Sequence, residues 1–325
     1  MDSVTLDGLD RQLLHALQLD GRAPFSRVAE VLGTADRTVA RRYRRLRAAG
    51  AARVLGLPDV RRTGHREWFV RVRCLPDAAP ALADALARRP DTSWVTVLAG
   101  GAELSVLVRD PDRALLEGLG RTPHVLSVQP CEMLRPFMDE GRAWPGRTSA
   151  LTAEQVAALR RRRGGTGGRV VLNELDARLL PALAVDGRAA YPELARAAGR
   201  SESAVRRRLA ELRLAGALQF TVETDPRLFG YAASYMLWLT VAPGRAAAVA
   251  GALAGDTEIA FIGAVTGPAA LVAYLVCRDA DDAFRYLDGR VGALDGVRGQ
   301  EAVPVTAYAK KVGSVPARRP ARAPR

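Results

Sequence analysis

Arginine is the residue type whose placement in this chain suggests chemistry. Six arginines fall between positions 37 and 47 and four more between 206 and 213: Arg37, Arg41, Arg42, Arg44, Arg45 and Arg47, then Arg206, Arg207, Arg208 and Arg213. Guanidinium groups neutralise phosphates, and they also donate two parallel hydrogen bonds to O6 and N7 of guanine in the major groove of DNA. The two clusters therefore indicate contact with a nucleic acid; the alternative is a solvated helix face.

The first cluster lies on a predicted amphipathic helix. Val39, Tyr43 and Leu46 recur at helical spacing, the pattern stops at Gly50, and the arginines fall between the apolar positions. The second cluster repeats this design with the apolar stripe Val205, Leu209 and Leu212. Each helix thus has an apolar side and a strongly cationic side, and the recurrence in both copies favours a binding face over a merely solvated one.

Two more helices are expected before the first cluster. Leu9, Leu13 and Leu17 form one apolar helix face, with Asp7 as a plausible N-cap and Gly21 as a plausible C-terminal stop. A second helix is expected at about 26–32, where Gly33 ends it. Three short helices with a glycine-containing turn between the second and third are typical of a helix-turn-helix.

This whole segment is duplicated. Residues 9–54 align without a gap with residues 175–220, a shift of 166, and 20 of the 46 positions are identical. A repeat of this length indicates a duplicated domain and not a solenoid unit of a few tens of residues.

The motifs resemble those of the leucine-responsive/asparagine-regulator (Lrp/AsnC) family of bacterial transcription regulators. The first copy carries Leu6-Asp7-x-x-Asp10-x-x-Leu13-Leu14, then Asp20-Gly21-Arg22, then Gly33 followed by Val39-x-Arg41-Arg42-x-x-x-Leu46-x-x-x-Gly50. The second copy matches with Asp176, Asp186-Gly187-Arg188 and Val205-x-Arg207-Arg208-x-x-x-Leu212-x-x-x-Gly216. The serine that starts the recognition helix in this family is Ser201 in the second copy but Ala35 in the first, so either Thr34 caps the first helix or that helix starts less firmly.

Beyond each arginine-rich helix the pattern becomes β-rich, in the order strand, helix, strand, strand, helix, strand. We expect these elements at 68–74, 78–87, 93–98, 103–108, 113–119 and 126–134, and again at 233–241, 245–253, 259–264, 270–277, 281–287 and 297–307. This is the order of the ferredoxin-like split βαβ arrangement. It resembles the RAM domain, the small-molecule-sensing domain of the Lrp/AsnC family. The expected fold class is α+β: two winged helix-turn-helix domains, each followed by a ferredoxin-like βαββαβ (RAM) domain.

The resulting domain division has six parts. We expect a first helix-turn-helix domain at 1–57, a first RAM domain at 64–137, a linker with a short helix capped by Thr152 at 138–170, a second helix-turn-helix domain at 171–223, a second RAM domain at 229–311 and a disordered basic tail at 312–325. Ordinary members of this family are homodimers, so the resemblance implies that the two halves of this chain form an intrachain pseudo-dimer. Further homo-oligomerisation of the chain is left open.

Double-stranded DNA is the expected partner. The residues predicted to contact it are Thr34, Arg37, Thr38, Arg41, Arg42 and Arg45 in the first copy, and Ser201, Ser203, Ala204, Arg207 and Arg208 in the second. Because the two recognition helices have diverged at these positions, unlike DNA half-sites are expected.

The resemblance also implies a small-molecule effector of the amino acid class. The family's effector site resembles a Gly-x-x-Asp turn between the second and third strands of the RAM domain, which reads Gly100-Gly101-Ala102-Glu103 in the first copy and Gly267-Pro268-Ala269-Ala270 in the second. A glutamate can accept hydrogen bonds from an amino group, whereas an alanine side chain cannot. Gly100, Glu103 and Gly267 are therefore the expected effector-binding residues; the alternative is that both glycines only form tight turns.

Composition fits a DNA-binding protein of the cytoplasm. The net charge of +13 attracts polyanions, although only two lysines are present, so arginine-rich codon usage is an alternative explanation. The three cysteines are far apart, without a CxxC pair, which predicts reduced thiols, no zinc finger, no bound metal and no cofactor. The N-terminus does not resemble a signal peptide, and no apolar run approaches the roughly 18 residues needed to span a bilayer.

An enzyme is the alternative function. Paired copies of this architecture also resemble sirohaem decarboxylases, whose tetrapyrrole substrate requires histidines and arginines around its propionates. Only His65, beside Arg61, Arg62 and Arg66, begins to fit, and the second copy has no histidine. No Ser/His/Asp set, phosphate loop or dinucleotide motif is apparent. The sequence thus favours a non-enzymatic, sequence-specific DNA-binding regulator.

Overall fold

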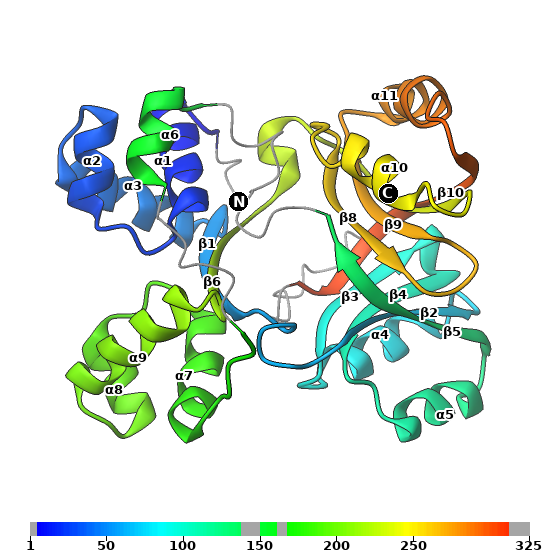
Figure 1. The fold of residues 1–325 in the computed structure, drawn as a ribbon, viewed down its shortest axis with the longest axis horizontal. Helices are drawn as coiled ribbons and strands as arrows, with labels where there is room; N and C mark the ends of the chain where they lie inside the picture. The colour runs from blue at the N-terminus through cyan, green and yellow to red at the C-terminus, as the bar shows by residue number, and fades with distance from the viewer. Residues whose placement is uncertain (1–4, 138–149, 161–167, 312–325) are drawn as a thin grey trace, which may run out of the picture. The chain divides into compact units, whose positions relative to one another are not determined.

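The computed structural model describes residues 5–137, 150–160 and 168–311 (Figure 1). The expected basic tail at 312–325 and residues 138–149 and 161–167 of the expected linker lie outside the described residues. The described residues form two compact units: residues 5–66 and those between 133 and 303 belong to the first, and residues 67–132 and 304–311 to the second. This division follows spatial contacts; the six-part division along the sequence stays a prediction. No helix among the described residues is long and apolar enough to cross a membrane.

The first unit contains two three-helix heads. The first head consists of α1 (Gly8–Leu19), α2 (Phe25–Leu32) and α3 (Asp36–Ala48), and the second of α7 (Glu174–Val185), α8 (Tyr191–Ala198) and α9 (Glu202–Leu214) (Figure 1). The predicted N-cap of α1 is confirmed, because the Asp7 carboxylate accepts from the Asp10 N–H in a capping box. The helix ends at Leu19 with Asp20 as its C-cap, so Gly21 follows the stop and is not the stop itself.

A strand that the sequence analysis did not predict follows each head. β1 (Ala52–Pro58) and β6 (Leu218–Thr224) pair with each other in an antiparallel two-stranded sheet. At the centre of this pair Leu55 lies opposite Thr221, and these two positions differ by the repeat shift of 166. The two heads therefore meet with twofold pseudosymmetry, as the halves of an isologous dimer do.

Reciprocal arginine contacts reinforce the pairing of the heads. Arg22 donates to the carbonyls of Gly187 (2.9 Å) and Ala189 (3.1 Å), and Arg188 donates to those of Gly21 (2.6 Å) and Ala23 (3.0 Å). Two ion pairs are also reciprocal: Arg47 with Asp186 at 2.8 Å and Arg213 with Asp20 at 2.6 Å. Because both copies of the repeat supply equivalent groups, the Asp-Gly-Arg motif holds the heads together.

A short linker helix, α6 (Ala153–Leu159), packs against α1 and α2 of the first head (Figure 1). Its predicted cap is confirmed, because the Thr152 hydroxyl accepts from the Gln155 N–H. Leu159 is fully buried in the core of the first head, the Gln155 side chain donates to the Val31 carbonyl (3.0 Å), and the Leu151 N–H donates to His15 Nδ1 (3.2 Å). The second head has proline, Pro181, at the position equivalent to His15, so it cannot offer that acceptor.

Because His15 is buried where α6 packs on the first head, we expect the free energy of unfolding to depend on pH. Burial lowers the pKa of His15 from 6.5 to about 4. Between these values the unfolded chain binds a proton that the folded chain does not, so stability is lost as the pH falls from 6.5 towards 4, by up to about 3 kcal/mol. Urea unfolding of the wild type and of His15→Asn across this range checks it. The variant should lose the extra acid sensitivity, and parallel pH profiles would contradict the assignment.

The second ferredoxin-like half lies mostly in the first unit. It runs through β7 (Ala233–Val241), α10 (Ala246–Leu253), β8 (Ile259–Val265), β9 (Leu271–Cys277), α11 (Ala280–Arg285), a π-helical turn (Tyr286–Val291) and β10 (Val297–Lys310). Strand β9 lies between β7 and β8, and its alternate residues Leu271, Ala273 and Leu275 are buried against α10 and α11. A 3-10 turn, Pro226–Phe229, connects this half to the second head.

The first ferredoxin-like half forms the core of the second unit. It consists of β2 (Glu67–Cys74), α4 (Ala79–Ala87), β3 (Thr92–Leu98), β4 (Glu103–Arg109), α5 (Arg113–Arg121) and β5 (Val125–Pro136). The sheet order is β3, β4, β2, β5, so the first and third strands occupy the centre, as the predicted split βαβ arrangement requires. The predicted α+β class is confirmed in both halves.

The last strand of each half is longer than predicted. The end of β5 pairs with β8 within the first unit, where Met133 lies opposite Val265. The end of β10 pairs with β3 within the second unit, where Val305 lies opposite Leu98. Each half thus supplies backbone hydrogen-bonding partners to the edge strand of the other half, which covers an edge that would otherwise be exposed.

Candidate nucleic-acid interface

Helix α3 has an apolar side that packs into the first head and a basic side that faces away from it. Val39, Tyr43 and Leu46 are buried in the core of the head, as predicted. On the opposite side, Arg37, Arg41 and Arg45 follow one another at a spacing of four and are exposed. Neither Arg37 nor Arg41 forms an ion pair with another described residue, which leaves both guanidinium groups available to a polyanion.

Arg42 points the other way and fixes α3 to α1. Its Nη1 contacts the carboxylates of Asp7 (2.6 Å) and Asp10 (2.9 Å), and Arg45 also binds Asp10. Asp10 is fully buried, and the hydrogen bond from Arg42 is the main cause of the lowered pKa of Asp7. In the structure two carboxylates of its own head hold the Arg42 guanidinium, the exposed Asp7 and the buried Asp10, and a buried aspartate requires a cationic partner. The predicted contact of Arg42 with DNA stays a prediction.

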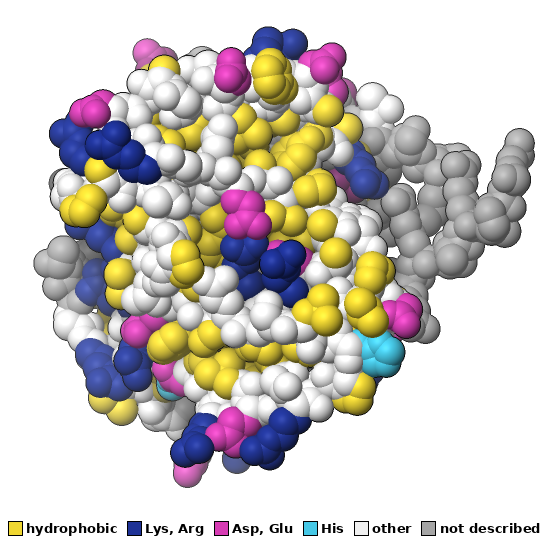
Figure 2. Space-filling view, turned by 90° about the vertical axis from the view of Figure 1, so that its right-hand side faces the viewer, with side chains coloured by type: hydrophobic (Ala, Val, Ile, Leu, Met, Phe, Trp, Pro, Cys, Tyr) yellow, Lys and Arg dark blue, Asp and Glu magenta, His cyan; other side chains and the backbone are white. Residues whose placement is uncertain are grey.

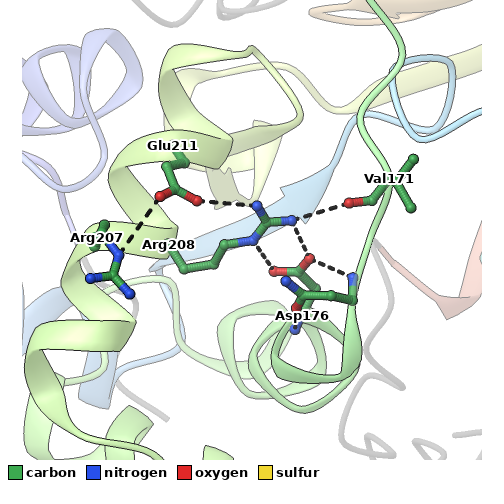
Figure 3. Close-up of polar contacts among 6 residues, drawn as sticks. Val171, Asp176, Arg207, Arg208 and Glu211 are labelled. Carbon is green, nitrogen blue, oxygen red and sulfur yellow. Dashed lines mark hydrogen bonds and ion pairs between the residues drawn. The ribbon is translucent and has the colours of Figure 1, made fainter.

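Arg208 has the same position in the second head (Figure 3). It binds Asp176 through two hydrogen bonds, Nε to Oδ1 at 2.9 Å and Nη2 to Oδ2 at 2.6 Å, and it also donates to the Val171 carbonyl at 3.2 Å. Asp176 is fully buried, and its hydrogen bonds are the main cause of the raised pKa of Arg208. Arg208, like Arg42, thus has a carboxylate partner within its own head, and its predicted contact with DNA stays a prediction.

The outward stripe of α9 differs from that of α3. The positions equivalent to Arg37, Arg41 and Arg45 are Ser203, Arg207 and Glu211, and all three are exposed. Glu211 lies between two arginines, with one carboxylate oxygen 3.9 Å from Arg207 Nε and the other 3.2 Å from Arg208 Nη1 (Figure 3). The stripe on α3 therefore carries three positive charges, whereas the stripe on α9 carries one positive charge and one negative charge.

The whole helices show the same asymmetry. Helix α3 contains six arginines and one aspartate, a net charge of +5, whereas α9 contains four arginines and two glutamates, a net charge of +2. On α9, Arg206 is also paired with Glu202 (3.5 Å) and lies 3.9 Å from the ring centroid of Tyr191. The first head therefore presents the stronger positive field to an approaching polyanion.

The two recognition helices also start differently. Ser201 caps α9, because its hydroxyl accepts from the Ala204 N–H (3.3 Å), and it lies 3.0 Å from the Ser203 hydroxyl. Helix α3 begins after Ala35 with no side-chain cap, so the suggestion that Thr34 replaces the missing serine is wrong. Asp36 in the first turn places a negative charge near the helix N-terminus, which partly compensates for the missing cap.

The residues proposed for an effector lie in two different compact units. In the second unit, Gly100 is in a left-handed turn (φ 67°) and its N–H donates to the Thr306 hydroxyl (2.9 Å). Glu103 is buried, and both its carboxylate oxygens are bound by Arg71, at 2.8 and 2.9 Å. Gly267 is in an exposed turn of the first unit (φ 105°). The carboxylate expected to accept from an effector amino group thus already has a cationic partner.

The residues suggested for the enzyme alternative lie on the turn after β1. Next to His65 on this turn, Gly64 has a φ of 81°, and the Arg169 guanidinium occupies the space that a side chain at Gly64 would fill. No group of three His, Cys, Asp or Glu residues in the described part of the chain could hold a metal ion. All three cysteines are free and buried, and burial raises the pKa of Cys277 to about 12, so that thiol is a poor nucleophile.

Charge on the face shown in Figure 2 is mixed. On the face shown in Figure 2, Lys and Arg side chains lie in small groups, several of them beside acidic side chains, with hydrophobic and uncharged residues between the groups. Among the described side chains visible there, no single basic surface stands out.

Comparison with known proteins identifies the two heads. The model of the AsnC-type helix-turn-helix domain matches residues 6–47 and again residues 172–213. The chain carries two AsnC-type helix-turn-helix domains. The matched segments contain α1 to α3 and α7 to α9 almost completely, and the resemblance to the Lrp/AsnC family is confirmed.

Relatives with a single copy align with one half of this chain. The HTH-type transcriptional regulator FL11 of Pyrococcus horikoshii is 29% identical over 149 residues, which are 46% of this chain and 98% of that protein. The HTH-type transcriptional regulator LrpA of the same organism is 27% identical over 128 residues, 39% of this chain and 91% of its own. Both come from an archaeon, so the family is not confined to bacteria.

A solved structure matches both halves together. The siroheme decarboxylase NirDL covers 94% of this chain and 93% of its own, with a TM-score of 0.64 and 15% sequence identity. At this identity the match shows a shared fold. It leaves function to be argued from the residues of this chain.

Proposed function

We propose that this protein is a sequence-specific DNA-binding transcriptional regulator with two unlike heads in one polypeptide. The observation that carries the proposal is the exposed stripe Arg37, Arg41 and Arg45 on the third helix of an AsnC-type helix-turn-helix. In this motif the third helix is the one that enters the major groove. Arginine at such positions can contact both phosphates and guanine.

Within this proposal the predicted contact residues have two roles. Thr34, Arg37, Thr38 and Arg41 of the first head contact DNA, as do Ser203, Ala204 and Arg207 of the second. Arg42 and Arg208 instead hold each recognition helix in position through Asp10 and Asp176. Ser201 caps α9, and Arg45 is shared between Asp10 and the DNA side.

The paired heads determine the geometry of the proposed site. Because β1 and β6 join the heads with twofold pseudosymmetry, the two recognition helices should meet half-sites whose centres are separated by about 34 Å or a multiple of it. Because the helices differ in their outward residues, the half-sites should differ in sequence.

Binding selection from random double-stranded DNA tests the proposal. Two unlike sequence elements separated by one or two helical turns are expected. Recovery of perfect palindromes would contradict the division between unlike heads, and no enrichment over random DNA would contradict sequence-specific binding.

A small-molecule effector of the amino acid class is the finer part of this proposal. The ferredoxin-like halves and the glycine turns at Gly100 and Gly267 support it, whereas the Arg71 pairing of Glu103 argues against a direct contact with that carboxylate. Measurement of DNA affinity with and without each of the common amino acids tests whether one of them modulates binding.

A sirohaem decarboxylase-like enzyme is the second candidate, favoured by the fold similarity to NirDL over nearly the whole chain. Incubation with sirohaem followed by visible spectroscopy and product analysis distinguishes the two candidates. A stoichiometric Soret band together with a decarboxylated product would favour the enzyme. We propose that neither appears, because His65 is the only histidine in the sequence with more than one arginine within four positions, and the second copy of the repeat has no equivalent.

A further inference from the structure

Glu211 is an acidic residue on the outward face of a recognition helix. Its side chain is half exposed (51%), and it lies one and two helical turns after Arg207 and Ser203 on the same stripe. Position 45, which is equivalent in the first head, is Arg45. The repeat therefore provides an internal comparison, in which the same place near DNA carries a positive charge in one head and a negative charge in the other.

Glu211 is held in place by the head beneath it. Arg208 is fixed by two hydrogen bonds to the buried Asp176, and it donates from its remaining Nη1 to Glu211 at 3.2 Å (Figure 3). The other oxygen of Glu211 lies 3.9 Å from Arg207, whose side chain is 77% exposed and is the movable partner. Glu211 thus stays on the outward face, while Arg207 can leave it for a phosphate.

A fixed carboxylate on this face has two effects on DNA binding. It repels phosphates and competes for Arg207, which weakens binding to DNA of arbitrary sequence. It can also accept a hydrogen bond from a base, and in the major groove the base edge that pairs with a glutamate is the N4 amino group of cytosine. In a half-site with cytosine opposite Glu211, this hydrogen bond offsets the repulsion between the carboxylate and the phosphates. A half-site without cytosine there has no such compensation.

We propose that Glu211 makes the second head selective for a half-site with cytosine opposite it, whereas the first head binds with less selectivity through its stripe of arginines. This inference rests on the proposed DNA-binding function. It adds the residue that determines specificity and names cytosine as the base whose amino group donates a hydrogen bond to it.

The test compares wild type and Glu211→Gln on two DNA sites that differ only at the selected cytosine of the second half-site. The wild type should bind the cytosine site roughly tenfold more tightly or better. Glu211→Gln should lose most of this preference and bind the site without cytosine more tightly than the wild type does. Glu202→Gln is the matched control, because Glu202 is the other glutamate of α9 and pairs with Arg206; it should keep the preference.

Arg45→Glu tests the same inference in the first head. The substitution places a glutamate near Asp10 and Arg42, the equivalents of Asp176 and Arg208, and it removes the ion pair of Arg45 with Asp10. It should lower the affinity for DNA and create a cytosine preference in the first half-site. This variant keeps the inference testable if Glu211→Gln disturbs the fold of the second head, which circular dichroism would reveal.

Unchanged base preference in both Glu211→Gln and Arg45→Glu, in proteins that bind DNA and are folded, would overturn the inference and leave the proposed function standing. A wild-type protein that shows no binding to double-stranded DNA at low salt would instead overturn the proposed function itself.

Discussion

Replacement of both Arg37 and Arg41 by alanine is expected to weaken binding to double-stranded DNA by roughly 100-fold or more. The two guanidinium groups are exposed on α3 and form no ion pair with another described residue, so their full charge is available to phosphates and bases. Contacts of this kind contribute about 1–3 kcal/mol each. The slope of log affinity against log salt concentration should also decrease by up to about 2, because each lost phosphate contact releases about one counterion fewer.

Two control variants make this result specific. Arg113→Ala removes an exposed arginine on α5, where it pairs with Glu117, and it should leave DNA affinity unchanged. Arg207→Ala in the second head should weaken binding less than the Arg37/Arg41 pair does, because Glu211 already competes for that guanidinium. Electrophoretic mobility shift or fluorescence anisotropy at several salt concentrations measures all three. Equal losses for Arg113→Ala and the α3 variant would contradict the assignment of α3 as the binding helix.

Replacement of Asp176 by alanine is expected to lower the free energy of unfolding by about 3–5 kcal/mol. Asp176 is fully buried, accepts two hydrogen bonds from Arg208, and completes the capping box at the start of α7 by accepting from the Asn173 N–H at 2.9 Å. Loss of Asp176 leaves the mostly buried Arg208 with only the half-exposed Glu211 as a carboxylate partner. The second head should unfold first, and its contribution to DNA binding should disappear with it.

Chemical denaturation followed by circular dichroism checks this expectation. Glu117→Ala breaks an ion pair on the surface of α5 and should change the stability by less than about 1 kcal/mol. The double variant Asp176→Ala, Arg208→Met removes both charges and should recover part of the loss. If Asp176→Ala were no more destabilising than Glu117→Ala, the positioning role of Asp176 and Arg208 would be refuted.

Local patterns were sufficient to predict most of the elements. The apolar stripes of α3 and α9, the Asp7 cap, and the strand-helix-strand order of both ferredoxin-like halves follow from periodicity and capping residues, which act within a few residues. Strands β1 and β6 were missed although β6 alternates apolar Leu218, Phe220 and Val222 with polar residues, a strand signal present in the sequence. Their pairing with each other, 166 positions apart, could not be read from local patterns.

The candidate site was predicted only in part. Counting arginines correctly located the helices but could not separate Arg41 from Arg42, since adjacent residues on a helix point about 100° apart. A signal was present in the sequence: Asp10 and Asp176 occupy equivalent positions in a helix that must be buried, and a buried aspartate implies a cationic partner. That partner could be named only when the packing of α3 on α1 and of α9 on α7 was known.

The sequence by itself determined that one module occurs twice, that each copy contains a helix-turn-helix and a ferredoxin-like half, and that the two recognition helices carry different charges. The tertiary structure decided which arginines face outward, that the Asp-Gly-Arg motifs join the two heads, and that Glu211 is fixed by Arg208 beside Arg207. The physical reason is that side-chain charge and helical spacing are local properties. The partner that a charge finds depends on which distant segments burial brings against it.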